Sequence, residues 1–588
     1  MAGTLSKSLA GLAVLGAVGI ALVVGRGVHR GNDGVGPPPA ASPAAPSRGG
    51  ELVASIRAEP DTYNRYVDQK AAGEVLALLT QASLVQVDRR TDTLEPWLAE
   101  AWTESDDHLT YTLKLRPGIA FSDGVPLTSA DVLFAFRALY DPKVNAEIAA
   151  DTLIDGKPLQ VSAPDAATVV LRFPAPFAPG LRLVDGIRIL PRHKLEPALL
   201  AGTFRDAWSV KTPLSDIAGL GPFVLAEHAP GQRLVFTRNP HYWRRDAAGI
   251  ALPYLDRLTL AVANQTTEAL RLQAGEIDLM ANADIRSEDY AAFKRAAEAG
   301  RVRLIDAGVG LDPNLLWFNL SSAQSADPRN AWLRHKAFRQ AVSCVVDRQA
   351  IVNTVYLGAA VPVFGPITPA NATWYADVRP ACEHDPQRAR QLFGSAGLSD
   401  RNGDGLLDDA SGTAARFSIL TQADNVRARV GAVIQEQLRQ AGITVDLVLL
   451  DQGAMFKRYA EGQYDTIYFG IQASATDPAL NPGFWLSSGN FHFWNPEQKS
   501  PATDWERRID TLMHQQGTTP DLAQRKRLFV EVQRILADEL PAIYFVTPKV
   551  TLAVSTRVAN PQPAPQLPQL LWSADTLAFD PAARQARE

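Results

Sequence analysis

The sequence has few cysteines and no excess of positive charge. Only two cysteines, Cys344 and Cys382, occur in 588 residues, which excludes a disulfide-scaffolded fold and a cysteine-based structural zinc site. The 58 Lys and Arg residues are outnumbered by 63 Asp and Glu residues, and the net charge is −5. A chain without a basic excess has nothing that attracts phosphates over a long range. Nucleic acid is therefore not an expected partner.

Catalytic signatures are also missing. The chain contains no H-E-x-x-H, G-x-S-x-G, Walker A or C-x-x-C motif, which are the usual signs of metalloprotease, hydrolase, nucleotide-binding and redox sites. Its nine histidines are scattered. Without a nucleophile, a metal set or an acid/base pair, no enzyme activity and no cofactor are expected.

Long apolar runs are absent after residue 25, which excludes a multispan membrane protein. The uncharged stretch Leu9–Gly25 would span roughly 25 Å as a helix. Residues 1–30 are therefore predicted to be a signal peptide or an N-terminal membrane anchor, and both alternatives stay open. Residues 31–50, rich in Pro, Ala, Gly and Ser, are predicted to be a linker. Either way residues 51–588 are expected to be exported, and an uncleaved helix at residues 9–25 would tether them to the inner membrane.

Beyond the linker, strand-like alternation and amphipathic helical patterns are interleaved, which predicts a mixed α/β fold. Thr128 and Asp131 stand three residues apart before an apolar run, the pattern of a helix-initiating capping box. Further helices are predicted over Glu268–Ala274, Ala331–Tyr356, Pro386–Ala396, Arg427–Ala441 and Ala523–Glu539. Strands are predicted over Arg233–Thr237, Thr259–Ala263, Thr444–Leu450 and Ile543–Val546.

One polar loop has the spacing of half a calcium site. Oxygen-bearing side chains occupy positions 1, 3, 5 and 9 of this loop, namely Asp400, Asn402, Asp404 and Asp408, with a glycine at position 6. Position 12, where a bidentate Glu should complete the shell, is Ser411. An ordinary Asp/Gly-rich turn is the preferred interpretation, and a calcium ion here would be structural.

Several sequence blocks together carry a family resemblance. The longest is LRPGIAFSDGVPLTSADVLFAF at residues 115–136. It is followed in order by GLGPFVL (219–225), LVFTRNPHYW (234–243), LRLQAGEIDL (270–279), FRQAVSCVVDRQAI (338–351), DPQRAR (385–390) and ELPAIYF (539–545). The set resembles the family 5 extracytoplasmic solute-binding proteins, which are the dipeptide, oligopeptide and nickel receptors of ABC importers.

The resemblance implies a periplasmic-binding-protein (Venus flytrap) fold with two α/β lobes, hinge strands between them and an additional lobe. By block order, lobe I comprises residues 51–90, 216–312 and 546–588, lobe II residues 91–215, and lobe III residues 313–545. The implied function is that of a periplasmic, monomeric receptor that captures a peptide-like ligand in the cleft and delivers it to an ABC transporter permease. Two alternatives stay open: a membrane-tethered sensor or scaffold with the same fold, and a receptor for an oligosaccharide, an opine or a metal chelate.

The segment Thr476–Pro496 is the first candidate for the cleft wall, because five of its 21 residues are aromatic and aromatic side chains on a loop need a cover of protein or ligand. The predicted ligand-contacting residues are Trp485, Phe491, His492 and Trp494. Trp317 and Asn319, near the crossing between lobes I and III, are second candidates. The alternative for the first four is packing inside lobe III, and for Trp317 and Asn319 a role in an ordinary strand is the preferred interpretation.

Peptide receptors of the family commonly hold the peptide amino group with an aspartate three residues before an Asp/Glu-Pro pair. Here the pair is Asp477-Pro478, and the position three residues earlier is Ser474. A neutral hydroxyl cannot compensate a desolvated ammonium group. Asp477 would either take over this role or cap the following turn, and the departure leaves room for blocked peptides and non-peptide ligands.

The two cysteines are 38 residues apart, and in an exported protein they could pair. Cys344 lies on an apolar helix face (AVSCVV). The preferred interpretation is that it is a buried small hydrophobic residue.

Overall fold

The computed structural model describes residues 48–321, 327–423, 425–470, 476–496 and 498–580. Contacts divide the chain into residues 1–45 and residues 46–588. The first unit lies outside the described residues, and so do the predicted signal or anchor segment at residues 9–25 and most of the linker. Within the described ranges, no helix has both the length and the apolar character needed to cross a membrane.

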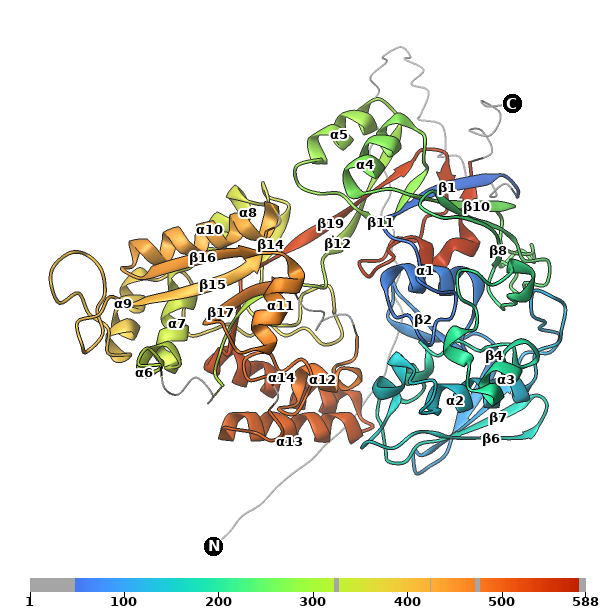
Figure 1. The fold of residues 1–588 in the computed structure, drawn as a ribbon, viewed down its shortest axis with the longest axis horizontal. Helices are drawn as coiled ribbons and strands as arrows, with labels where there is room; N and C mark the ends of the chain where they lie inside the picture. Colours follow the sequence, from blue (N-terminus) through green and yellow to red (C-terminus); the bar gives the residue numbers. More distant parts are fainter. Residues whose placement is uncertain (1–47, 322–326, 424, 471–475, 497, 581–588) are drawn as a thin grey trace, which may run out of the picture. The chain divides into compact units, whose positions relative to one another are not determined.

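Four separated stretches of chain build the larger sheet (Figure 1). Seven of its eight described strands follow the order β12 (Val302–Val309), β19 (Val546–Ser555), β11 (Leu279–Asp284), β1 (Glu51–Ile56), β10 (Arg257–Val262), β9 (Arg233–Arg238) and β8 (Phe223–Ala229). The eighth, β14 (Ala360–Pro362), pairs with β19. The strands β10, β1 and β11 run parallel, as expected for strands connected by helices.

The two faces of this sheet are covered differently. Side chains alternate along β1, so that Leu52 and Ala54 enter the main core while Val53 packs with α4 (Gln265–Ala274) and α5 (Tyr290–Glu298). The opposite face receives α1 (Ala71–Thr80). Because both faces are covered, apolar side chains of β1 are packed on both sides of the sheet.

Residues 91–215, the range predicted as lobe II, carry an antiparallel sheet. Its strands lie in the order β4 (Ala99–Glu104), β5 (Thr110–Leu115), β7 (Thr168–Arg172) and β6 (Gln160–Asp165). The helices α2 (Ser129–Tyr140) and α3 (Arg192–Ala201) accompany it, and a short hairpin of β2 (Val85–Asp88) and β3 (Thr93–Pro96) precedes it. The antiparallel sheet leaves one face polar, as the alternating burial of β5 shows.

Lobe III has a sheet whose described strands are β16 (Thr444–Leu450), β15 (Arg416–Gln422), β17 (Thr466–Gly470), β13 (Asn314–Phe318) and β18 (Ala542–Tyr544), in that order. Leu316 and Phe318 face the core formed with α7 (Lys336–Val345), α9 (Pro386–Ser395) and α10 (Asn425–Gln440). Leu315 and Trp317 face α11 (Gln452–Ala460) on the other side. Because successive side chains of β13 point to opposite faces, the strand contacts helices on both sides of the sheet.

Further helices complete the described part of lobe III. They are α6 (Asn330–Leu333), α8 (Arg348–Thr354), α12 (Pro482–Trp485), α13 (Asp504–Thr518) and α14 (Leu522–Glu539). Near the C-terminus, β20 (Val558–Ala559) pairs with β21 (Ala578–Phe579).

Two segments connect lobes I and III, and they cross in contact. The Gly310 N–H donates to the Pro548 carbonyl (2.8 Å), and the Thr547 hydroxyl donates to the Gly310 carbonyl (3.3 Å). A Cβ at position 310 would lie 2.9 Å from the Pro548 oxygen, closer than side chains normally approach. Glycine is therefore needed for the two hinge segments to touch.

The mixed α/β class predicted from the sequence is confirmed. The predicted capping box is also confirmed, since the Thr128 N–H donates to the Asp131 carboxylate (3.0 Å) at the start of α2. The prediction of one helix over Ala331–Tyr356 is wrong. The segment forms α6, α7 and α8. The first break falls at the extended His335, whose Nδ1 accepts from the Ala337 N–H (3.2 Å) at the start of α7. The second falls at the extended Val346, after which the Asp347 carboxylate caps α8 by accepting from the Ala350 N–H (3.0 Å).

Candidate functional site

A cavity of about 850 Å³, the main cavity, lies where parallel strands from both large sheets end. Its lining includes Gln265 and Ile285, just after β10 and β11 of lobe I, and Gln422 and Gly470, the last residues of β15 and β17 of lobe III. The carboxyl ends of parallel strands are where ligands bind in open α/β sheets, because the strand-to-helix loops there can vary without disturbing the sheet. The position predicts a ligand site.

On the lobe III wall, an arginine is held in a fixed orientation. Arg427, in the first turn of α10, donates from Nε to the Asn314 side-chain oxygen (3.0 Å) and from Nη1 to the Gln422 side-chain oxygen (2.8 Å). Its guanidinium carbon lies 4.5 Å from the centre of the Phe469 ring. A guanidinium oriented in this way matches the planar geometry of a carboxylate.

Gly470 leaves room for this arrangement. A Cβ at position 470 would lie 2.7 Å from the Asn314 side-chain oxygen and 3.5 Å from Nη2 of Arg427. Any side chain would therefore push Asn314 out of the position from which it orients Arg427.

On the lobe I wall, the charges are paired. The hydrogen bond from Arg286 to the Asp289 carboxylate (2.6 Å) raises the pKa of the Arg286 guanidinium above its ordinary value. Glu288 lies 3.8 Å from Arg286 and 3.8 Å from Arg429 of α10. Glu288 therefore links the lobe I wall to lobe III.

The two hinge segments contribute Asp312, Pro548 and Lys549 to the lining of the main cavity. The Lys549 side chain is exposed, and no carboxylate of the described residues lies within ion-pair distance of its ammonium group. Lys549 and Arg427 are thus two cationic groups that a ligand can meet in one cavity.

A second cavity of about 210 Å³, the side cavity, lies on another part of the lobe boundary. Lobe III contributes Ala370–Thr373 and Thr476, and the Asn371 side-chain nitrogen donates to the Thr476 carbonyl (3.2 Å). Lobe II contributes Asp92 and Arg182, which are hydrogen-bonded to each other. Thr476, which lines the side cavity, is the first described residue after Gly470.

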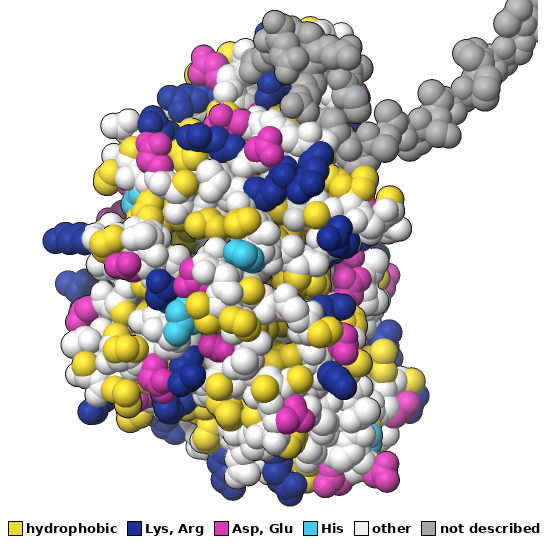
Figure 2. Space-filling view, turned by 90° about the vertical axis from the view of Figure 1, so that its right-hand side faces the viewer, with side chains coloured by type: hydrophobic (Ala, Val, Ile, Leu, Met, Phe, Trp, Pro, Cys, Tyr) yellow, Lys and Arg dark blue, Asp and Glu magenta, His cyan; other side chains and the backbone are white. Residues whose placement is uncertain are grey.

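Charges on the surface are mixed. Figure 2 shows positively and negatively charged side chains interspersed over one face, with apolar side chains between them. Electrostatic recognition is therefore expected from individual oriented groups such as Arg427 rather than from a broad field of one sign.

The predicted aromatic residues lie elsewhere. Trp485 packs on Phe529, with ring centres 5.0 Å apart, and Trp494 packs on His492, with ring centres 4.2 Å apart. The side chains of Trp485, His492 and Trp494 are buried, whereas Phe491 is 51% exposed. The main and side cavities are lined by other described residues. This structure thus places three of the four rings in the interior of lobe III.

His492 and Trp494 serve a buried carboxylate. His492 Nε2 and Trp494 Nε1 hydrogen-bond Glu506 Oε1 at 2.9 and 3.2 Å, and the Thr503 N–H donates to Glu506 Oε2 (2.9 Å). Burial alone would raise the pKa of Glu506, but the hydrogen bonds outweigh it and hold the pKa at about 2. The carboxylate is ionised and anchors the start of α13.

The second-rank candidates are also internal. Trp317 is fully buried, with its ring centre 5.0 Å from that of Phe493. The Asn319 side-chain nitrogen donates to the carbonyls of Gly462 (3.2 Å) and Tyr464 (3.1 Å). Trp317 and Asn319 therefore hold the C-terminal end of β13 against other segments of lobe III.

Asp477 is engaged in a buried ion pair. Its Oδ1 accepts from Nη2 of Arg525 (2.6 Å) and from the Ala479 N–H (3.0 Å). Both side chains of the pair are about 5% exposed. Asp477 therefore caps the turn and pairs inside lobe III, whereas Ser474 lies outside the described residues.

The loop with calcium-like spacing uses its oxygens internally. Asp400 accepts from the N–H groups of Gly403 (2.7 Å) and Gly405 (3.1 Å), and Asp404 accepts from the Leu406 N–H (2.8 Å). Asn402 accepts from the Asp404 N–H (2.9 Å), and Asp408 from the Arg401 N–H (3.3 Å). Across the described ranges, no three His, Cys, Asp or Glu side chains are grouped for a metal ion. Calcium binding at this loop stays a prediction.

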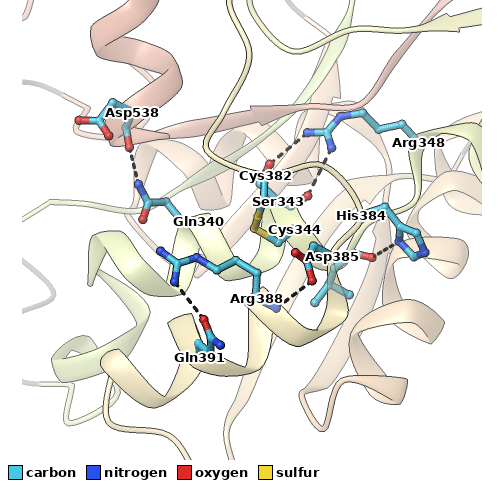
Figure 3. The surroundings of a disulfide bond; sticks show 11 residues. Gln340, Ser343, Cys344, Arg348, Cys382, His384, Asp385, Arg388, Gln391 and Asp538 are labelled. Carbon is cyan, nitrogen blue, oxygen red and sulfur yellow. Dashed lines mark hydrogen bonds between the residues drawn. A yellow bond between two sulfur atoms is a disulfide. The ribbon is translucent and has the colours of Figure 1, made fainter.

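The preferred interpretation of Cys344 needs correction. Cys344, at the end of α7, is buried as expected, but it also forms a disulfide with Cys382, their Cα atoms 5.4 Å apart (Figure 3). The fold brings residue 382 back to α7 before α9 begins, a return that the sequence pattern did not reveal.

Residues of the main cavity were not singled out from the sequence. The signal that could have found them is position, since Gln422 and Gly470 end the largely apolar strands β15 and β17 and Arg427 begins a predicted helix. Lys549 lies in a hinge strand, for which no local signal exists.

Comparison with known proteins gives one consistent result. Residues 93–493 match the family model described as bacterial extracellular solute-binding proteins, family 5 middle. A probable ABC transporter-binding protein of Deinococcus radiodurans is 27% identical over 542 residues, covering 88% of this chain and 89% of the relative.

Solved structures of similar fold carry different ligands. The oligopeptide-binding protein AppA from Bacillus subtilis, in complex with a nonapeptide, has a TM-score of 0.70 at 24% identity and covers 91% of this chain and 100% of its own. The periplasmic binding protein MelB from Agrobacterium fabrum, in complex with stachyose, has a TM-score of 0.72 at 20% identity and covers 91% of this chain and 86% of its own.

Proposed function

The chain belongs to family 5 of the bacterial extracellular solute-binding proteins, and we propose that its ligand is a peptide-like molecule whose carboxylate is held in the main cavity. As a family member it is an extracytoplasmic receptor with the periplasmic-binding-protein fold, and it delivers its solute to an ABC transporter permease. The observation that carries the ligand proposal is the oriented guanidinium of Arg427 in a cavity at the strand ends of both sheets.

Capture by such a receptor needs no bond making or breaking. Lobes I and III are connected through β19 and the segment around Gly310, so a change at these two hinge segments can open or close the cavity. A ligand that contacts both walls favours the closed arrangement, because only there does it gain both sets of contacts.

The charges of the main cavity support an acidic ligand group. Arg427 is oriented by Asn314 and Gln422, and Lys549 lacks a described carboxylate partner. The position at which the family commonly carries an amine-binding aspartate is Ser474. The two carboxylates that line the cavity, Glu288 and Asp312, already have partners in the protein. A carboxylate without a free neighbouring amine, as in an amino-blocked peptide, therefore fits this set better than a zwitterionic peptide does.

The fold alone does not select between ligand classes, since AppA in complex with a nonapeptide and MelB in complex with stachyose share it. Thermal unfolding should therefore be measured with matched probes: N-acetyl-trialanine, its C-terminal amide, unblocked trialanine and stachyose. We expect the largest rise in Tm with N-acetyl-trialanine, because a ligand that binds only the folded state stabilises it by mass action.

Two variants test the assigned residues by titration calorimetry. Arg427→Gln and Lys549→Gln should each raise the Kd of N-acetyl-trialanine about tenfold, or about 1.4 kcal/mol. Lys457→Gln is the control, because Lys457 is highly exposed on α11 and pairs at 4.0 Å with Glu461. If the amide bound as tightly as the acid, the carboxylate assignment would be wrong, and if a broad panel of solutes gave no shift, the ligand proposal would fall.

We further propose that residues 9–25 bring the receptor to the outer side of the inner membrane, as a signal peptide or as a retained anchor. The apolar stretch and the Pro-rich linker that follows support this placement. Intact mass of the protein purified from membranes decides between the alternatives: a chain that retains Met1 is anchored, and one that begins after Gly25 has been cleaved.

A further inference from the structure

We propose that the Cys344–Cys382 disulfide is a positioning element for the ligand site in the main cavity, and that it acts through the irregular segment that contacts the hinge at Gly310 and lines the side cavity. The inference rests on the proposed receptor function. It concerns residues 363–385, which lie between β14 and α9 and form neither helix nor strand.

The middle of this segment reaches the hinge and the lobe boundary. The buried Thr368 hydroxyl donates to the Gly310 carbonyl (2.8 Å) at the crossing of the two hinge segments. Asn371 donates to the Thr476 carbonyl (3.2 Å), and Ala370–Thr373 line the side cavity. Residues 368–373 therefore touch the hinge and the wall of a cavity at once.

The far end of the segment is held mainly to itself. Arg379 donates to Asp377 (2.9 Å) and Glu383 (2.7 Å) and lies over the Phe364 ring at 4.7 Å. All of these partners belong to the same irregular segment. These contacts shape residues 377–383, whereas Trp374 is fastened to α14, because its carbonyl accepts from the Gln533 side-chain nitrogen (3.1 Å) and its ring packs on Phe529 with centres 5.8 Å apart.

The disulfide fastens the C-terminal end of the segment covalently. It bonds Cys382 to the buried end of α7, where the Asp385 N–H also donates to the Cys344 carbonyl (2.9 Å) and His384 Nδ1 to the Val345 carbonyl (3.2 Å) (Figure 3). Arg348 of α8 lies over the Phe364 ring at 4.8 Å and donates to Ser343 next to Cys344 (3.1 Å). The disulfide thus fixes the C-terminal end of the irregular segment. Its two cysteines are 38 residues apart, and the chain between them includes Thr368, which contacts the hinge.

Without the disulfide, the segment would be in its binding-competent place for only part of the time. The apparent Kd rises in inverse proportion to that fraction, so a competent fraction of about one tenth raises it roughly tenfold. The predicted effect is on ligand affinity and on exchange of the segment, not only on overall stability.

The test compares oxidised protein, reduced protein and the variant Cys344→Ala/Cys382→Ala. Dithiothreitol gives two electrons and two protons, so that it becomes a cyclic disulfide and both cysteines become thiols. Cys382 is half-buried and accessible to the reagent. Hydrogen exchange of residues 363–385 and the Kd of N-acetyl-trialanine are measured well below Tm, with circular dichroism to establish that the protein stays folded.

We expect reduction and the double variant to speed exchange across residues 363–385, to leave exchange of β15 and β17 unchanged, and to raise the Kd roughly tenfold. The double variant should not respond to dithiothreitol. Arg379→Gln, which breaks contacts within the segment but keeps the disulfide, is the matched control and should change the Kd less than twofold.

Unchanged exchange would overturn the inference, and so would faster exchange with an unchanged Kd. If the double variant does not fold, the reduced wild-type protein gives the same comparison. If oxidised protein bound no probe of the panel, the ligand proposal would fall, whereas the exchange measurement would still decide whether the disulfide fastens the segment.

Discussion

Two polar clusters of lobe III are built alike but face different surroundings. In the interior, Glu506 is fixed by His492 and Trp494 and is 3% exposed. At the main cavity, Arg427 is fixed by Asn314 and Gln422 and stays partly exposed. Glu506 and its two partners are buried, whereas Arg427 lines a cavity of about 850 Å³.

The comparison shows what marks a binding wall in this fold. Aromatic density marked the interior cluster, because large rings are covered most efficiently by other rings. The cavity wall is marked instead by its place at strand ends and by an oriented charge. Substitutions in the interior should therefore change stability, and substitutions at the wall should change binding.

The largest effect should follow from breaking the buried Asp477–Arg525 pair. In Asp477→Ala, Arg525 is left as an uncompensated buried charge, so the free energy of unfolding should fall by about 3–5 kcal/mol. Urea denaturation measures it. Asp446→Ala breaks the exposed pair with Arg416 and should cost no more than about 1 kcal/mol. If the free energy of unfolding fell equally in Asp477→Ala and Asp446→Ala, the proposed difference between the buried and the exposed ion pair would be wrong.

A smaller effect should appear on acidification. The pKa of Glu506 is about 2 in the folded protein against an ordinary value of 4.5, so its stabilising contribution is complete above pH 4.5 and is lost as pH falls toward 2. The slope should reach at most about 1.4 kcal/mol per pH unit in this window.

Glu506→Gln isolates that contribution. The difference in the free energy of unfolding between wild type and variant should shrink as pH falls from 4.5 to 2, measured by urea denaturation at several pH values. The Kd of N-acetyl-trialanine at pH 7 should stay unchanged, because Glu506 does not line the main cavity. A constant difference across the window would contradict the low pKa.

The smallest effect on stability should come from Gly470→Ala at the cavity wall. The new Cβ would lie 2.7 Å from the Asn314 side-chain oxygen, so overpacking should cost about 1 kcal/mol. Displacement of Asn314 should weaken binding of N-acetyl-trialanine by more than it weakens folding. In the control, Gly394→Ala, the Cβ meets nothing within 4 Å in α9, and it should be neutral or stabilising because alanine favours helices. If Gly470→Ala lost stability but bound N-acetyl-trialanine as tightly as the wild type, Gly470 would be a structural residue and not part of the binding wall.

Local chemistry made parts of this fold readable from the sequence. The Thr128–Asp131 capping box located the start of α2 because both partners lie within one turn. The same pattern at Thr503–Glu506 starts α13, and it could have been read in the same way. Within Ala331–Tyr356, the break between α7 and α8 depended on Asp347, whose capping role competes with continuation of the helix.

The candidate site was less accessible to sequence reasoning. Asp477 meets Arg525, which is 48 residues away, and Cys344 meets Cys382 only because the irregular segment returns to α7. Such pairings follow from tertiary topology, which no local pattern encodes. Arg427 and Gly470 were within reach, because the parallel-strand rule gives their edge of the sheet once the strands are placed.

The position of β19 has a consequence for how the chain acquires its shape during synthesis. In the order β12-β19-β11-β1, this strand separates two strands that are made much earlier, and it spans residues 546–555 of 588. β12 therefore cannot find its neighbour β19 until residues 310–545 have been made. The larger sheet stays incomplete while this long stretch is added, so its completion is a late, long-range step of folding.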